Sequence, residues 1–154
     1  VVEDLMVRMN ELFLDVTPRG SFSSLFFAVF DLERGVLEFS NAGHHHPFVV
    51  RPNGAIVDLT AGGTVLGLVK DAGYERGEVA IAKGDLLVFY SDGLTDRSNG
   101  EGELFGVERL KEAAIRSRGD TARIALYTLL GDAQGWSGGA PAEDDITLIV
   151  SKVR

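Results

Sequence analysis

The sequence contains no cysteine, and it has only four prolines and one tryptophan in 154 residues. A disulfide scaffold, a thiolate zinc site and a cysteine nucleophile are therefore excluded for this chain. No apolar run approaches the roughly 20 residues that span a bilayer. A signal peptide is not visible at Val1, because no basic region followed by an apolar one begins there. We therefore expect a cytoplasmic protein without a membrane segment.

Positive charge is also scarce. The chain has 15 basic and 23 acidic residues, which gives a net charge of −8 at pH 7. Nucleic-acid binders and proteins that bind anionic lipid need a basic face, so we expect neither nucleic acid nor membrane as a partner. A glycine loop of the Gly-x-x-x-x-Gly-Lys type is absent, which leaves a nucleotide-binding function without support.

The patterns that are present predict an α+β fold. Helical spacing of apolar residues predicts a helix over residues 2–16 whose buried stripe comprises Leu5, Met9, Leu12, Phe13 and Val16. Further helices are predicted over 106–117 and over 120–130, the second capped by Asp120 and followed by a Gly- and Ala-rich loop. Apolar segments between turn signals predict strands at 24–32, 36–40, 47–51, 55–59, 65–69, 74–81, 85–90 and 146–153. Asn53-Gly54 is a strong hairpin signal between two of them.

Acidic residues stand at the ends of two of these strands. The strand over 85–90 leads into Asp92-Gly93, and the pair Asp144-Asp145 directly precedes the last strand. Two strands that each deliver a carboxylate to one end of a sheet predict a metal-binding edge, because carboxylate oxygens suit Mg²⁺ and Mn²⁺. The alternative is structural, since Asp-Gly is a common turn dipeptide and adjacent acids are often solvated.

Five short motifs follow one another in a recognisable order. They are Asn41-Ala42-Gly43-His44, Leu66-Gly67, Tyr90-Ser91-Asp92-Gly93-Leu94-Thr95-Asp96, Phe105-Gly106-Val107-Glu108-Arg109-Leu110 and Asp144-Asp145-Ile146-Thr147-Leu148. In this order they resemble the SpoIIE-like branch of the PPM-type metal-dependent serine/threonine protein phosphatases, from about residue 5 to residue 153. The resemblance implies an αββα sandwich of two antiparallel sheets flanked by helices.

Two motifs of such phosphatases are missing here, namely Gly-Asp-aromatic-aromatic-Asp and Asp-Val-x-Gly-x-Gly. The expectation is therefore that residues 1–154 form the carboxy-terminal part of one phosphatase domain, truncated at the N-terminus. An uncovered sheet edge in such a domain favours pairing with another chain, so a homodimer is a possible state.

The resemblance also implies roles for single residues. Asp92 and Asp144 would be metal ligands and catalytic residues, and Asp145 would be a further ligand or would orient its loop. His44 and Gly93 are possible phosphate or substrate contacts, whereas His45 and His46 are predicted to be loop residues. Relatives carry a small residue where this chain has Arg97, and glutamate where it has Asp96.

The implied activity is hydrolysis of phosphoserine or phosphothreonine on a bacterial signalling protein by a metal-activated water. The implied substrate is a phosphorylated regulatory protein, typically an anti-sigma factor antagonist. Mn²⁺ or Mg²⁺ would be the cofactor, with two ions in a complete domain and weak or absent binding in a truncated one. The alternative functions are a catalytically inactive phosphatase-like binding module and an oligomerisation domain.

Overall fold

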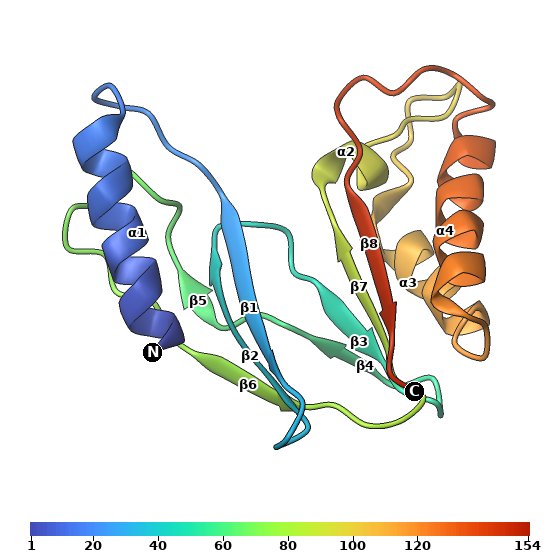
Figure 1. Ribbon diagram of the computed structural model, residues 1–154. Coiled ribbons are helices and arrows are strands. Elements are labelled where there is room, and N and C mark those ends of the chain that lie inside the picture. The colour runs from blue at the N-terminus through green and yellow to red at the C-terminus, as the bar shows by residue number, and fades with distance from the viewer. The chain divides into compact units, whose positions relative to one another are not determined.

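The computed structural model describes all 154 residues, which form two compact units. Unit 1 comprises residues 1–46 and 59–82, and unit 2 comprises residues 47–58 and 83–154. Each unit contains one four-stranded sheet and at least one helix (Figure 1). The predicted α+β class is therefore confirmed.

Unit 1 is built around one central strand. Its elements are α1 (Val2–Val16), β1 (Leu25–Asp31), β2 (Val36–Ala42), β5 (Gly62–Gly63) and β6 (Gly77–Ala80). β2 pairs antiparallel with β1 along its whole length and antiparallel with β6. It also pairs in parallel with the two residues of β5, where a Cβ on Gly62 would lie 1.9 Å from the carbonyl oxygen of Asn41. Only glycine allows this close pairing.

Helix α1 has the predicted bounds but a different buried face. Its buried residues are Val2, Met6 and Asn10, whereas Leu12 and Val16 are 61% and 69% exposed. Met6 packs in one apolar cluster with Ala42, Leu66, Ala72 and Tyr74. Met9 and Phe13 of the predicted stripe pack against this cluster, whereas Leu5, Leu12 and Val16 are exposed. The buried face is therefore rotated relative to the predicted stripe, and it includes the polar residue Asn10.

That polar residue, Asn10, also explains why the strand predicted over 65–69 does not form. The side-chain oxygen of Asn10 accepts a hydrogen bond of 2.8 Å from the backbone N–H of Gly67. Its side-chain nitrogen donates one of 2.8 Å to the carbonyl of Val69. Leu66 forms a single antiparallel bridge with Ser23, but the groups of Gly67 and Val69 that could continue the pairing are bonded to the Asn10 side chain. The segment is therefore a loop.

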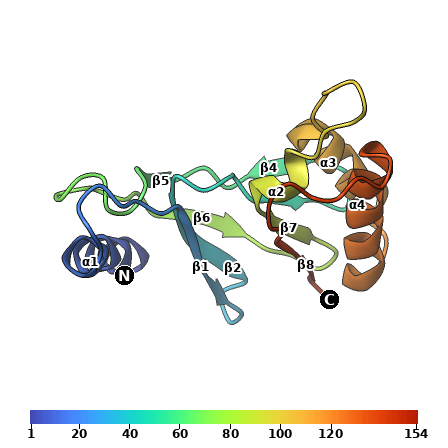
Figure 2. The same ribbon diagram turned by 90° about the horizontal axis from the view of Figure 1, so that it is seen from above.

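Unit 2 contains an antiparallel sheet in the order β4-β3-β7-β8. Its elements are β3 (Phe48–Val50), β4 (Ile56–Asp58), β7 (Leu86–Tyr90), α2 (Asp92–Thr95), α3 (Gly106–Arg116), α4 (Ala122–Trp136) and β8 (Leu148–Lys152). The predicted Asn53-Gly54 hairpin joins β3 to β4, and Gly54 has a φ of +88°. Helices α3 and α4 lie on the same face of the sheet (Figure 2). The core between the sheet and these two helices includes Val88, Leu110 and Leu129, which are fully buried.

Helix α4 is longer than predicted. It begins after Thr121, whose hydroxyl accepts a hydrogen bond of 3.3 Å from the backbone N–H of Ile124, so Asp120 is not the cap. It also continues through Gly131 to Trp136, where a loop was predicted. Packing overrides the low helix propensity of glycine here, since Ala133 is buried in the core and the Trp136 ring packs against it. None of the helices is long and apolar enough to cross a membrane.

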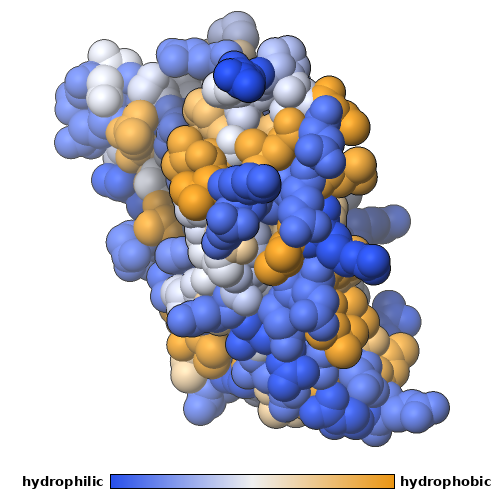
Figure 3. All heavy atoms as spheres, turned by 90° about the vertical axis from the view of Figure 1, so that its left-hand side faces the viewer, coloured by the Kyte–Doolittle hydropathy of each residue, from blue (hydrophilic) through white to orange (hydrophobic).

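Strand β1 forms an open edge within unit 1, because it pairs only with β2. Val29 and Phe30 on this strand are 44% and 42% exposed. On the face where α1 lies, apolar groups form separate patches among polar ones (Figure 3). An unpaired apolar strand is a template for pairing with another chain.

We expect the isolated chain to self-associate through β1. Val29→Lys should favour the monomer, because a charged side chain on an edge strand opposes pairing. Val69→Lys, at a residue that is 48% exposed but outside the sheet, is the matched control. Light scattering over a series of protein concentrations measures the oligomeric state. A wild-type chain that stays monomeric at every concentration would contradict the expectation.

Candidate metal centre

Strands β7 and β8 deliver two acidic segments to the same end of the sheet in unit 2. The antiparallel register ends at the pair Tyr90–Leu148. It is extended by Ser91, whose backbone N–H donates a hydrogen bond of 3.0 Å to the carbonyl of Thr147. Because the end of β7 lies beside the start of β8, Asp92 and the segment before β8 lie at one edge. The sequence predicted this arrangement.

Ser91 holds the two segments together with its side chain as well. Its hydroxyl accepts a hydrogen bond of 2.9 Å from the backbone N–H of Thr147 and donates one of 3.2 Å to the carbonyl of Asp145. Ser91 occupies the N-cap position of α2 but makes no side-chain bond to that helix. The hydroxyl therefore fixes the segment before β8 relative to the end of β7, a role that the sequence alone did not reveal.

Gly93 lies directly against the backbone of the second acidic segment. A Cβ on Gly93 would lie 2.2 Å from the carbonyl oxygen of Asp145 and 3.2 Å from that of Asp144. No side chain fits at such a distance, so the close approach of the two segments requires glycine. The predicted contact of Gly93 with phosphate or substrate stays a prediction beside this structural role.

The three predicted ligands are exposed carboxylates on these two segments. Asp92 is the first residue of α2, and its Oδ1 accepts a hydrogen bond of 3.0 Å from the backbone N–H of Gly93. The Oδ1 of Asp144 accepts one of 2.7 Å from the backbone N–H of Asp145. These local bonds orient the carboxylates of Asp92 and Asp144.

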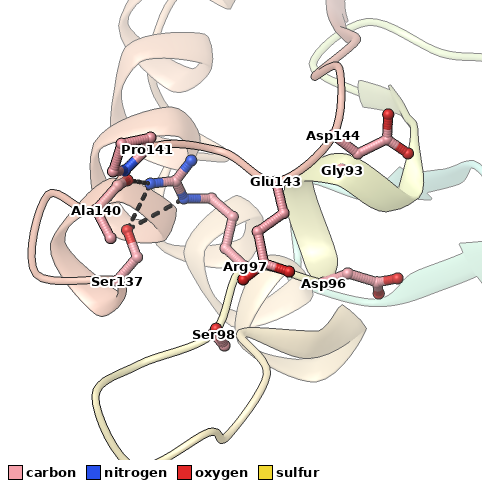
Figure 4. Close-up of a pocket in the computed structure, with 9 residues that line it drawn as sticks. All are labelled: Gly93, Asp96, Arg97, Ser98, Ser137, Ala140, Pro141, Glu143 and Asp144. Carbon is pink, nitrogen blue, oxygen red and sulfur yellow. Dashed lines mark hydrogen bonds between the residues drawn. The ribbon is translucent and has the colours of Figure 1, made fainter.

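A pocket of about 320 Å³ adjoins the two segments. Its lining comprises Gly93, Asp96, Arg97, Ser98, Ser137, Ala140, Pro141, Glu143 and Asp144 (Figure 4). The side chains of Asp96 and Asp144 point away from Arg97, which extends toward Ser137 and Ala140. The pocket thus has an acidic side, formed by carboxylates, and a side at which a buried cation is held.

The donor set fits a hard divalent cation in type. Carboxylate and carbonyl oxygens are the ligands that Mg²⁺ and Mn²⁺ prefer, and no sulfur or imidazole lines the pocket. Nowhere in the chain do three or more histidine, aspartate or glutamate side chains form a ready ligand cluster. An ion held by these residues would therefore retain several waters, as Mg²⁺ commonly does.

His44 belongs to unit 1, whereas the acidic segments belong to unit 2. Its backbone N–H donates a hydrogen bond of 2.7 Å to Oδ1 of Asn41, whose Nδ2 donates one of 2.8 Å back to the carbonyl of His44. Gly43 between them has a φ of +68°. The motif Asn41-Ala42-Gly43-His44 therefore encodes a side-chain-clamped turn, and the predicted phosphate contact of His44 stays a prediction. His45 and His46 are exposed loop residues, as predicted.

Tyr90, the last residue of β7, is buried directly before the acidic segment. It is 3% exposed, and its ring lies edge-on to that of Phe48 with centroids 6.1 Å apart. Burial raises the pKa of Tyr90 to about 12, and the negative charges of Asp58 and Glu108 add to the effect. The phenol is therefore neutral throughout the physiological range.

Comparison with known proteins shows the family of the chain. The sequence profile of the Stage II sporulation protein E (SpoIIE) family matches residues 2–154. The chain belongs to this family of PP2C-type phosphatases, which confirms the resemblance read from the motifs.

Two curated relatives are similar to the chain. Protein IcfG of Synechocystis sp. is 31% identical over 128 residues, which are 83% of this chain and 20% of that protein. The phosphoserine phosphatase RsbU of Bacillus subtilis is 30% identical over 149 residues, or 95% of this chain and 43% of RsbU. The chain thus spans less than half the length of either relative.

Solved structures show the fold. The RsbU and RsbW domains of Rv1364c from Mycobacterium tuberculosis match 100% of this chain and 42% of that one, with a TM-score of 0.78 and 22% identity. The catalytic domain of the serine/threonine phosphatase PstP, in complex with two manganese ions, matches 99% of this chain and 70% of that one. Its TM-score is 0.64 and its identity 16%. The chain therefore has the fold of PP2C-type phosphatase domains.

Gly93→Ala should disrupt the candidate metal centre while the fold is retained. The added methyl would overlap backbone atoms of Asp145, which have no flexible end that could move aside. We expect Mn²⁺ affinity to fall about tenfold or more, because displaced ligands bind metal poorly. Gly100→Ala is the matched control, since a Cβ there meets nothing within 4 Å. Mn²⁺ titration followed by electron paramagnetic resonance measures the effect, and equal affinity in the two variants would contradict it.

Alkaline pH should destabilise the protein through Tyr90. Since the folded state raises the pKa of Tyr90 from 10.0 to about 12, the unfolded state loses this proton first. The stability that this group contributes is complete below about pH 10 and is lost as the pH rises toward 12. Urea midpoints at pH 9 and pH 11.5 should differ less in Tyr90→Phe than in wild type. Tyr127→Phe is the control, because Tyr127 is 66% exposed, and it should behave like wild type. If the urea midpoint of Tyr90→Phe fell between pH 9 and pH 11.5 as much as that of wild type, Tyr90 would not be the cause of the alkaline destabilisation.

Proposed function

We propose that this chain carries part of the metal centre of a serine/threonine protein phosphatase and that Asp92 and Asp144 are metal ligands. The observation that carries the proposal is the junction at the end of β7. There Ser91 and Gly93 hold the segment of Asp144 and Asp145 against the turn that begins with Asp92. The fold of PP2C-type phosphatases and the name of the relative RsbU support the same activity.

Mn²⁺ or Mg²⁺ is the proposed cofactor, which agrees with the manganese ions in the similar structure of PstP. When bound, such an ion lowers the pKa of a water and neutralises charge on phosphoryl oxygens. Asp92 and Asp144 would hold the ion, and Asp145 would contribute as a further ligand or by orienting the loop. The chain supplies no thiol for a covalent phosphoenzyme, because it has no cysteine.

The proposed substrate is phosphoserine or phosphothreonine on a bacterial signalling protein, of which an anti-sigma factor antagonist is the specific candidate. The relative RsbU is a phosphoserine phosphatase, and the similar structure from Mycobacterium tuberculosis joins RsbU and RsbW domains. His44 is a proposed phosphate contact. A cytoplasmic location and a homodimer stay predictions.

A second candidate function is a phosphatase-like module that binds a partner without catalysis. The observation that favours it is the absence of any cluster of three or more ligand-type side chains. Two carboxylates alone hold a divalent ion weakly, because such ions prefer about six oxygen ligands. Activity measurements separate the two candidates.

Hydrolysis of p-nitrophenyl phosphate in the presence of Mn²⁺ tests the proposal. We expect Asp92→Asn and Asp144→Asn each to lower the rate about 100-fold, because each removes a charged ligand. Glu101→Gln is the matched control, since Glu101 is an exposed acid on the neighbouring loop that does not line the pocket. Activity that persists without Mn²⁺, or that is equal in all four proteins, would contradict the assignment. No activity in wild type would favour the binding module.

A further inference from the structure

Arg97 is a buried cation on the loop that follows α2. It is 8% exposed, and its backbone carbonyl accepts a hydrogen bond of 2.8 Å from the N–H of Phe105. The guanidinium Nε and Nη2 donate hydrogen bonds of 3.2 and 2.5 Å to the hydroxyl of Ser137. Nη2 also donates one of 2.5 Å to the carbonyl of Ala140. One side chain thus joins two loops that lie 40 residues apart in the sequence.

The partners of this cation are all neutral. Although Asp96, Glu143 and Asp144 line the same pocket, none of them forms an ion pair with Arg97. Its side chain points away from Asp96 and Asp144 (Figure 4). Burying an arginine without a carboxylate is costly unless its donors are satisfied by well-placed acceptors. The contacts with Ser137 and Ala140 supply those acceptors, so the guanidinium acts as a bridge between loops.

The loop that Arg97 holds leads directly to the second acidic segment. Residues 138–145 are exposed and lie outside any helix or strand. The backbone N–H of Ala140 bonds to the carbonyl of Ser137, and the next hydrogen bonds along the chain are those of Asp144 and Asp145. Residues 141–143 make no hydrogen bond of their own. Between α4 and Asp144, the hydrogen bond from Arg97 to the carbonyl of Ala140 is therefore the long-range contact nearest to Asp144.

We propose that Arg97 is a positioning residue for the candidate metal centre. Its guanidinium fixes the start of the loop before β8 to the loop after α2, and it thereby sets where Glu143 and Asp144 stand relative to Asp92. This inference rests on the proposed function, because it assigns Arg97 to that site. Arg97 touches neither metal nor substrate, so it is not a catalytic residue.

The test compares Arg97→Met, Arg97→Lys and Ser137→Ala with wild type. Arg97→Met removes all three donated bonds. Arg97→Lys keeps the positive charge but places its donors on a single nitrogen. Ser137→Ala removes the acceptor shared by Nε and Nη2. The matched control is Arg109→Met. Arg109 lies 3.8 Å over the Trp136 ring and donates to the carbonyls of Leu104 and Phe105. Its loss therefore affects the same unit, but it removes no contact with residues 138–145.

Hydrogen exchange of the metal-free chain is the first readout. In Arg97→Met we expect the amides of Asp145 and Thr147 to exchange about tenfold faster, because a charge-assisted tie on their loop is lost. Arg97→Lys and Ser137→Ala should show intermediate increases, while Arg109→Met should show none at these amides. The amides of β7 should keep their wild-type protection in every variant. If Arg97→Met does not fold, the two milder variants carry the test.

Mn²⁺ binding followed by electron paramagnetic resonance is the second readout. Arg97→Met should raise the Mn²⁺ concentration for half-saturation about tenfold, and Arg97→Lys should restore part of the affinity. Unchanged exchange in Arg97→Met, or faster exchange with unchanged Mn²⁺ affinity, would overturn the inference. A wild-type chain that binds Mn²⁺ but hydrolyses no phosphate would count against the proposed activity alone, since neither readout depends on turnover.

Discussion

The pairing of β7 with β8, carried one step further by Ser91 and Thr147, is the constraint on which the candidate site depends. An antiparallel register places the end of one strand beside the start of the other, and the two bonds between Ser91 and Thr147 fix that register at the edge. Gly93 then allows the backbones to approach more closely than any side chain would permit. The two acidic segments are thus brought together by contacts with the backbone, made by Ser91 and Gly93.

The rest of unit 2 keeps that edge in position. β7 is buried between its two neighbouring strands and beneath α3 and α4, in a core that contains Leu86 and Val88. At the opposite end of β7, the buried Asp85 forms an ion pair of 2.5 Å with Arg51, the residue that directly follows β3. A strand that is anchored at both ends is a rigid support for ligands, and loops supported by rigid elements commonly carry function.

Much of this arrangement could be predicted from the sequence, because it follows from local patterns. The bounds of α1 follow from helical spacing, the hairpin follows from Asn53-Gly54, and the acidic residues were predicted at one end of a sheet because each adjoins a strand. Long-range contacts could not be predicted. The Asn10 side chain accepts a hydrogen bond from the backbone of Gly67, in a segment that was predicted to be a strand. The Arg97 side chain donates to Ser137, which lies 40 residues further along the chain. No periodicity or dipeptide signal records which distant backbone group a polar side chain will meet.

We propose that Asp92 and Asp144 hold the same ion. Paramagnetic broadening of amide resonances by substoichiometric Mn²⁺ tests it most directly, because the broadening depends steeply on the distance from the metal. We expect the amides of Gly93 and Asp145 to broaden together at the same Mn²⁺ concentration, and we expect Asp144→Asn to abolish both effects. Broadening that is confined to one segment, or that spreads over unrelated surface acids, would contradict it.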